Sequence, residues 1–95
     1  MPGYVIAELE VTDPAGFEDY RKAVPATIAA YGGRYLARGG ALESLEGGWS
    51  PKRMVILEFP SMAQAKAWYA SAEYCDLLAL RQRTTRSKVV LLEGL

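Results

Sequence analysis

Residues 53–61 of the chain read Arg-Met-Val-Ile-Leu-Glu-Phe-Pro-Ser, an almost wholly apolar run that stops at a proline. A run of this kind indicates a β-strand that is buried on both faces of its sheet. Pro60 ends the strand, and Ser61 followed by Gln64 is a capping-box pattern that predicts the start of a helix. The stretch therefore predicts an interior strand that leads directly into a helix.

The N-terminal part of the chain predicts the same order of strand and helix. Residues 4–12 alternate in polarity and are rich in β-branched side chains, which indicates a strand. Asp13 and Pro14 then form an N-cap and a first helical residue. An apolar stripe follows at helical spacings, formed by Phe17, Tyr20, Val24, Ile28 and Tyr31. We expect Pro25 to kink this helix or to end its first half, and Gly32-Gly33 to close it.

The remaining segments complete the order of elements. A second strand is predicted over residues 34–38, with a bulge or sharp bend at Gly39-Gly40 and a continuation through Leu42 and Leu45. Residues 47–51 are predicted to form a turn or hairpin loop. A helix through residues 65–69, a second helical segment that Ser71 caps, and a mostly apolar strand over residues 88–93 follow.

This order, β-α-β-β-α-β, is typical of a ferredoxin-like α+β sandwich, and 95 residues make one such domain, residues 1–95. Right-handed crossovers place both helices on the same face of a four-stranded antiparallel sheet. The other face is then uncovered, yet the apolar third and fourth strands make it unsuited to water. We therefore expect a homodimer that closes this face, with a monomer whose sheet stays partly apolar as the alternative.

Charge and residue types argue against several classes of function. Eleven basic and eleven acidic residues cancel, which argues against a general attraction to nucleic acid or to an anionic membrane. No apolar stretch is long enough to span a bilayer and no signal peptide is recognised, so a cytoplasmic location is expected. The chain has no histidine and a single cysteine, Cys75, so no metal site, internal disulfide or cofactor is predicted.

Short motifs spread along the whole chain carry a family resemblance. They are Gly3-Tyr4-Val5-Ile6, Thr12-Asp13-Pro14, Tyr20, Val24-Pro25, Ala30-Tyr31-Gly32-Gly33, Arg38-Gly39-Gly40, Glu46-Gly47, Trp49, Pro51-Lys52-Arg53, Glu58-Phe59-Pro60, Ala67-Trp68-Tyr69, Ser71, Glu73-Tyr74 and Leu80-Arg81. With these motifs the sequence resembles the domain of unknown function 1330 family, in the dimeric α/β-barrel superfamily. The resemblance implies a ferredoxin-like fold, a dimer whose two sheets form a barrel, and no established activity. Superfamily relatives include cofactor-free monooxygenases, haem-degrading enzymes and small-ligand sensors, which is an analogy of fold.

Charged residues on strands that should be buried mark a first candidate site. If the wholly apolar faces of the first and third strands meet the helices, the charged residues of the sheet point to the open face. Alternation along each strand places there Glu8 and Glu10, then Arg34, Leu36 and Arg38, then Met54, Ile56 and Glu58. A buried carboxylate is unfavourable unless it is paired, and arginine is its natural partner. We predict a Glu–Arg cluster that contains Arg38 and Glu58, with a structural ion-pair network as the alternative to a ligand site.

A second candidate group combines aromatic and hydroxyl side chains: Tyr20, Trp68, Tyr69, Ser71 and Tyr74. Tyr20 and Tyr69 are predicted to place hydroxyl groups in a pocket between the helices and the sheet. Arg53 and Arg81 are predicted to complete that pocket. The alternatives are that the aromatic residues are ordinary core residues, and that Arg81 complements the dipole of its helix.

Three functions are compatible with these patterns. The first is a homodimer that binds a small polar or anionic molecule, with the ligand-binding candidates Glu8, Tyr20, Arg38, Arg53, Glu58, Tyr69, Ser71, Tyr74 and Arg81. The second is a cofactor-free enzyme, monooxygenase- or isomerase-like, in which Glu58 transfers a proton and Arg38 holds an anion. The third is a structural or interaction module without a ligand.

Overall fold

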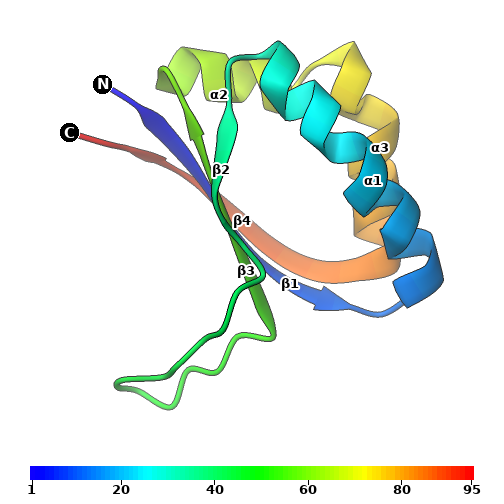
Figure 1. The fold of residues 1–95 in the computed structure, drawn as a ribbon, viewed down its shortest axis with the longest axis vertical. Coiled ribbons are helices and arrows are strands. Elements are labelled where there is room, and N and C mark those ends of the chain that lie inside the picture. Colours follow the sequence, from blue (N-terminus) through cyan, green and yellow to red (C-terminus); the bar gives the residue numbers. More distant parts are fainter.

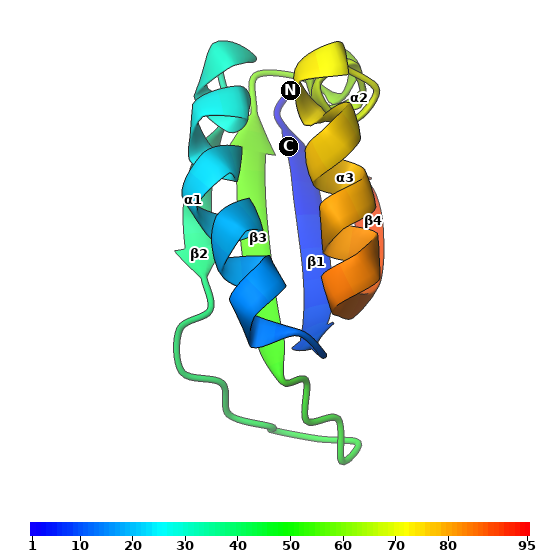
Figure 2. The same ribbon diagram turned by 90° about the vertical axis from the view of Figure 1, so that its right-hand side faces the viewer.

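Four strands form one antiparallel sheet in the spatial order β2-β3-β1-β4, and three helices lie on one face of it. The computed structural model describes residues 1–95. In chain order the elements are β1 (Gly3–Val11), α1 (Pro14–Ala30), β2 (Arg34–Arg38), β3 (Arg53–Phe59), α2 (Met62–Tyr69), α3 (Ala72–Thr84) and β4 (Thr85–Glu93). Figures 1 and 2 show that the helices cover one face and that no element of the chain covers the other. The predicted ferredoxin-like α+β fold is confirmed.

The register of the two central strands fixes which side chains meet the helices. Val5 of β1 lies opposite Leu57 of β3, and Ile6 lies opposite Ile56. Val5 and Leu57 are buried under the helices, whereas Ile6 and Ile56 are only half-buried on the open face. The prediction that the apolar faces of these two strands meet the helices is therefore correct.

α1 begins at the predicted cap but does not end at its internal proline. The Asp13 carboxylate accepts a hydrogen bond from the Gly16 N–H at 3.2 Å, and Pro14 is the first helical residue. The helix then continues through Pro25 to Ala30, which corrects the expectation that Pro25 could end its first half. Burial of the apolar stripe on both sides of the proline outweighs the one missing backbone hydrogen bond.

The other predicted helix ends are also in place. Ser61 caps α2 by accepting the Gln64 N–H at 3.1 Å, and Ser71 caps α3 by accepting the Tyr74 N–H at 3.2 Å. Gly32, with a φ of 76°, follows α1 in the left-handed conformation that closes a helix. Each of these signals is local, so the sequence carries it without reference to the rest of the fold.

Between β2 and β3 the chain departs from its predicted course. The irregularity in the β2–β3 ladder lies between Tyr35 and Ala37, at Leu36, and not at Gly39-Gly40. Residues 39–52 form a loop without a strand, so the predicted continuation through Leu42 and Leu45 is wrong. These two leucines are 47% and 89% exposed, so no burial stabilises an extended pairing there. The loop projects beyond the end of the sheet (Figure 2).

α1 packs closely on α3. Its buried residues Phe17, Tyr20, Val24 and Ile28 share one hydrophobic core with side chains of β1 and β3. Trp68 of α2, 2% exposed, ties the helices together because its indole N–H donates to the Thr27 hydroxyl of α1 at 3.0 Å. The helices and the inner strands therefore share one hydrophobic core.

The open face of the sheet carries an apolar patch over β1 and the edge strand β4, with charged residues beside it. Val90 and Leu92 of β4 are 58% and 54% exposed there, next to the half-buried Ile6 of β1. Two ion pairs flank this patch, Arg34 with Glu58 and Arg86 with Glu10. None of the helices is both long enough and apolar enough to cross a membrane.

A matched pair of leucine substitutions tests this layering. Leu57 is 4% exposed under the helices, so Leu57→Ala should lower the free energy of unfolding by about 2–5 kcal/mol. Leu45→Ala in the projecting loop, where the leucine is 89% exposed, should change it by less than about 0.5 kcal/mol. Urea denaturation measures both values, and equal effects would contradict the assignment of the core.

Candidate functional site

The gap between α1 and the sheet holds a cavity of about 50 Å³, several times the space that one water molecule needs. Eighteen residues line it, and they come from all four strands and all three helices. Fourteen of them are apolar or aromatic and the other four are arginines, so the lining contains no carboxylate. The cavity is thus an apolar chamber whose charged groups are all cationic.

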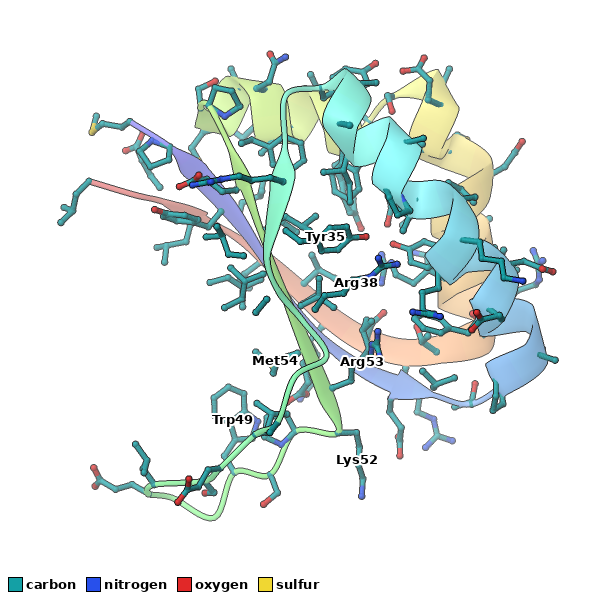
Figure 3. The ribbon with its side chains drawn as sticks, viewed as in Figure 1. Tyr35, Arg38, Trp49, Lys52, Arg53 and Met54 are labelled. Carbon is teal, nitrogen blue, oxygen red and sulfur yellow. The ribbon has the colours of Figure 1, made fainter.

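The bulge in β2 brings its polar side chains into this chamber. Tyr35 lies opposite Leu57 and Arg38 lies opposite Val55, so both face the helices although they are three positions apart. The extra residue at Leu36 reverses the alternation of the strand between them. Figure 3 shows Tyr35, Arg38 and Arg53 pointing from β2 and β3 toward α1, and Trp49 and Met54 on the other side of the sheet.

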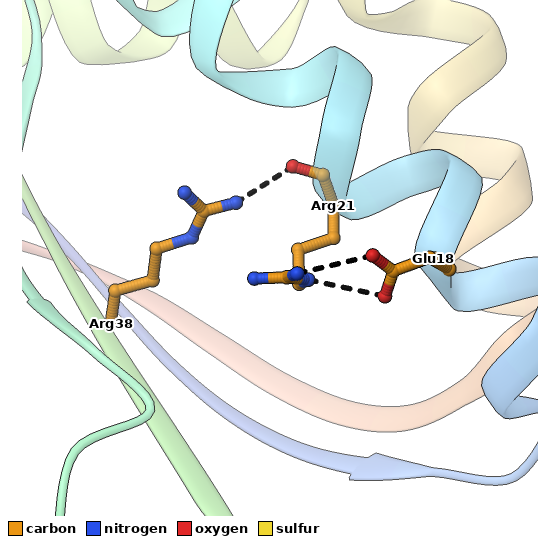
Figure 4. A network of polar contacts seen from close by, with 3 residues as sticks. All are labelled: Glu18, Arg21 and Arg38. Atoms are coloured by element: carbon orange, nitrogen blue, oxygen red, sulfur yellow. Dashed lines mark hydrogen bonds and ion pairs between the residues drawn. The ribbon is translucent and has the colours of Figure 1, made fainter.

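Arg38 bridges the mouth of the cavity from β2 to α1. Its guanidinium donates to the backbone carbonyl of Arg21 at 2.7 Å (Figure 4), and it lies 4.6 Å from the centre of the Tyr35 ring. Pro25 has no N–H to give to the carbonyl of Arg21, four residues earlier in the helix. The proline therefore leaves free the oxygen that Arg38 binds. The Arg21 side chain itself pairs with Glu18 at 3.1 Å.

Arg53 is the least satisfied polar side chain of the site. Its Nε atom is buried and has no hydrogen-bond partner. The guanidinium carbon lies 5.6 Å from the centre of the Phe17 ring. A Cβ atom on Gly39 would come within 2.7 Å of that carbon, and Gly39 has a φ of 68°. Glycine at position 39 thus permits both the turn and the close approach of Arg53.

A network of hydroxyl groups surrounds the buried Arg81 at the other side of the cavity. Arg81, 4% exposed, donates to the hydroxyls of Tyr74 and Tyr69, each at 3.3 Å, and to that of Ser87. The hydroxyls of Tyr74 and Tyr20 are 2.9 Å apart. Burial raises the pKa of the Tyr20 phenol, and the neighbouring Tyr74 hydroxyl raises it further. Tyr20 is therefore a neutral hydrogen-bond donor at physiological pH.

The cavity is electropositive because three of its four arginines lack a carboxylate partner. The ion pairs of the molecule join Arg21 to Glu18, Arg34 to Glu58 and Arg86 to Glu10. Arg38, Arg53 and Arg81 have none, and Arg81 is almost fully buried. An unpaired cation in an apolar setting is unfavourable, and a bound anion would relieve it.

The structure brings together most of the predicted site residues. Tyr20, Arg38, Arg53, Tyr69, Tyr74 and Arg81 line the same cavity. Ser71 does not line it; its hydroxyl donates to the Trp68 carbonyl at 2.7 Å, and it caps α3. Glu8 faces the open side, where it accepts the indole N–H of Trp49 at 2.7 Å.

The predicted cluster of Arg38 with Glu58 does not form. Glu58 points to the open face and pairs with Arg34 at 2.8 Å, whereas Arg38 points to the helices. The prediction assumed unbroken alternation from Arg34 to Arg38, and the bulge at Leu36 breaks it. The face given for Arg34 and Glu58 is correct, and the face given for Arg38 is wrong.

The sequence analysis missed two polar residues of the cavity, Arg21 and Tyr35. Tyr35 enters the cavity from the sheet. It is half-buried, and burial raises the pKa of its phenol while the nearby Arg38 opposes that rise. Its place between two arginines in a predicted strand could have drawn attention to it. No group of three or more carboxylate, cysteine or histidine side chains lies close enough together to hold a metal ion.

Comparison with protein families matches residues 2–95 to the family described as a domain of unknown function, DUF1330. The chain belongs to this family. No curated protein matches the sequence. The DUF1330 assignment agrees with the fold and supplies no activity.

Solved structures share the fold of this DUF1330 chain at low sequence identity. RPA0582, a protein of unknown function from Rhodopseudomonas palustris, has a TM-score of 0.80 and 17% identity, with 99% of this chain and 82% of that chain covered. A dimeric ferredoxin-like protein of unknown function from Thermobifida fusca has a TM-score of 0.67 and 18% identity over 99% and 92%. SnoaB, a cofactor-independent oxygenase from Streptomyces nogalater, has a TM-score of 0.66 and 12% identity over 99% and 93%. At these identities the likeness is one of fold.

A double-mutant cycle tests the contact between Arg38 and the Arg21 carbonyl. In Pro25→Ala, the new N–H of residue 25 takes that carbonyl, so Arg38 loses its acceptor. We expect Arg38→Met to lower the free energy of unfolding by about 1 kcal/mol more in the original chain than in the Pro25→Ala background. Urea denaturation of the four proteins gives this difference. An equal effect of Arg38→Met in both backgrounds would show that the contact contributes no stability.

Proposed function

We propose that this chain is a homodimeric protein that binds a small organic anion in the cavity between its helices and its sheet. The observation that carries the proposal is the set of three cavity arginines without a carboxylate partner, in a lining that contains no acidic residue. A fold that needed these charges only for its own stability would pair them with carboxylates.

The rest of the lining sets the character of the molecule. Apolar and aromatic side chains make up most of the wall, so the ligand has an apolar body. The buried Arg53 Nε lacks a partner, and guanidinium groups bind carboxylates through two parallel N–H donors. A carboxylate on a small apolar skeleton satisfies both features.

The alternative of a cofactor-free enzyme finds less support in the geometry. SnoaB is a cofactor-independent oxygenase, and a protein from Nitrosomonas europaea is described as a putative antibiotic biosynthesis monooxygenase, with a TM-score of 0.55 and 17% identity. Both share the fold of this chain. Glu58, the proposed proton-transfer group, lies on the other face of the sheet and is held by Arg34 at 2.8 Å. A reaction in the cavity would have to proceed without a carboxylate base, since none lines it.

The third alternative, a module without a ligand, accounts for the open face and not for the cavity. The pairs of Arg34 with Glu58 and of Trp49 with Glu8 lie on that face and position the strands and the projecting loop. They therefore serve as structural contacts. They do not explain an unpartnered guanidinium nitrogen inside the molecule.

We infer the homodimer from the open face of the sheet. Val90 and Leu92 are exposed there around a half-buried centre, which favours burial against a second copy of the sheet. Neighbours from Thermobifida fusca and Jannaschia are described as dimeric ferredoxin-like proteins. The cavity lies on the opposite side of the sheet, so each protomer keeps its own site.

Binding of a carboxylate can be tested with a matched pair of probes. Benzoate should raise the melting temperature of the protein and bind measurably by calorimetry, whereas benzamide, its neutral counterpart, should not. Arg53→Met should weaken benzoate binding by about tenfold or more, because one charge-assisted contact is lost. Arg83→Met removes an exposed arginine outside the cavity and is the control. A small-acid panel that never shifts the melting temperature would leave the module without a ligand as the better account.

The dimer is tested by light scattering coupled to size exclusion. The original chain should have twice the mass of its protomer, and Val90→Asp, which places a charge in the apolar patch of the open face, should yield monomers. Ala79→Asp on the exposed side of α3 should leave the dimer intact. A concentration-independent monomer for the original chain would contradict the assembly and leave the binding proposal untouched.

A further inference from the structure

A second hollow, separate from the cavity, lies on the outside of the molecule beside the junction of α3 and β4, which pack on each other (Figure 2). This groove is open to solvent, measures about 330 Å³ and is lined by Tyr69, Arg81, Gln82, Thr85, Ser87 and Val89. Five of these residues carry a hydroxyl, amide or guanidinium group, and none is acidic. Tyr69, Arg81 and Val89 also line the cavity, so the groove and the cavity share part of one wall.

Arg81 supplies the groove with a buried charge that nothing in the chain neutralises. The residue is 4% exposed, and it takes part in none of the ion pairs. Three of its five N–H groups donate to hydroxyl oxygens: Nε to Tyr74, Nη1 to Ser87 and Nη2 to Tyr69. The other two N–H groups, one on each Nη, make no hydrogen bond to the chain. Neutral hydroxyls therefore satisfy part of this guanidinium without supplying the negative charge that would stabilise it.

The Nη1 and Nη2 atoms form the edge of Arg81 on the groove side. Ser87 and Tyr69, which accept from these two atoms, both line the groove. Tyr74, which accepts from Nε, lines the cavity and not the groove. The two N–H groups without an acceptor are thus on the nitrogens nearest to the groove.

Hydroxyl groups add neutral donors at the same place. The Tyr69 oxygen accepts from Arg81 at 3.3 Å, and its own O–H makes no other hydrogen bond within the chain. The Ser87 oxygen also accepts from Arg81, and its other contact is with the Thr85 hydroxyl at 3.4 Å. Thr85 donates its proton to the Arg81 carbonyl at 2.7 Å. An acceptor in the groove can therefore bind the O–H groups of Tyr69 and Ser87 together with the N–H groups of Arg81.

We propose that this groove binds a phosphate-type oxyanion, as the free ion or as the phosphoryl group of a small molecule, against the Nη1–Nη2 edge of Arg81. The arginine fork matches two phosphate oxygens, and the other oxygens can accept from the hydroxyls of Tyr69 and Ser87. The groove has one aliphatic side chain, Val89, so it lacks the apolar wall that the body of an organic acid finds in the cavity. This site goes beyond the proposed function and does not depend on it.

Calorimetry and thermal unfolding with inorganic phosphate and with glycerol 3-phosphate test the groove. Both are compared with sodium chloride of equal ionic strength, which separates binding from general screening. We expect a measurable affinity for at least one of the two and a higher melting temperature in its presence. Tighter binding of inorganic phosphate would support a site for the free ion, and tighter binding of the ester a site for a phosphoryl group.

Two conservative variants locate the binding without removing the buried guanidinium. Tyr69→Phe and Ser87→Ala should each weaken phosphate-type binding by about tenfold, because each removes a hydrogen bond to a charged ligand. Tyr31→Phe and Ser44→Ala are the matched controls, since both residues lie outside the groove, and they should leave the affinity unchanged. Arg53→Met, which alters only the cavity, should also keep it.

Three results would overturn the oxyanion site. They are an effect no larger than that of sodium chloride, an affinity that survives both groove variants, and an affinity lost in Arg53→Met, which would place the ion in the cavity. Benzoate binding is measured separately, so its absence would overturn the proposed function and leave the result for the groove intact.

Discussion

The extra residue at Leu36 is the constraint on which the candidate site depends. In an unbroken strand, Arg34 and Arg38 would share the open face, where Glu58 already pairs with Arg34. The bulge reverses the alternation after Tyr35 and sends Arg38 toward the helices instead. The bulge thus leaves Arg34 beside Glu58, which neutralises it, and places Arg38 on the helix side, where no carboxylate pairs with it. The electropositive character of the cavity follows from that separation.

Pro25 has the complementary effect on the facing helix. A proline inside a helix leaves one carbonyl without its usual donor, and here the carbonyl belongs to Arg21 on the side that faces β2. Arg38 binds this oxygen across the mouth of the cavity. This hydrogen bond joins α1 to β2, while the Trp68–Thr27 and Tyr20–Tyr74 contacts hold α1 to the other helices. Side chains of α1, of the strands and of the other helices line the cavity that lies between them.

The fold was predictable because its signals are local and repeated. Asp13, Ser61 and Ser71 each cap the helix that follows them, and alternating apolar residues mark the face of β1 that meets the helices. The aromatic and arginine residues of the cavity were also predictable as a group, since helical spacing brings Tyr20, Tyr74 and Arg81 to the inner side. These inferences need only the period of a helix or a strand.

The position of Arg38 was not predictable in the same way. The amino-acid types around Leu36 do not indicate a bulge. A shift of one residue in the alternation moves every later side chain of the strand to the other face of the sheet. The strand predicted through Leu42 and Leu45 was wrong for a related reason. These exposed leucines lie in the loop of residues 39–52, where no neighbouring strand pairs with the chain. Both errors arise where tertiary contacts, rather than neighbours in sequence, decide the conformation.

Gly39 links the loop to the charge of the cavity. It has no Cβ atom, which leaves room for the guanidinium of Arg53. The guanidinium of Arg53 occupies the volume that any side chain at position 39 would need. Adding one methyl group there would displace a cation from the cavity wall, in addition to straining the loop. The electrostatic potential inside the cavity therefore depends partly on Gly39, an uncharged residue without a side chain.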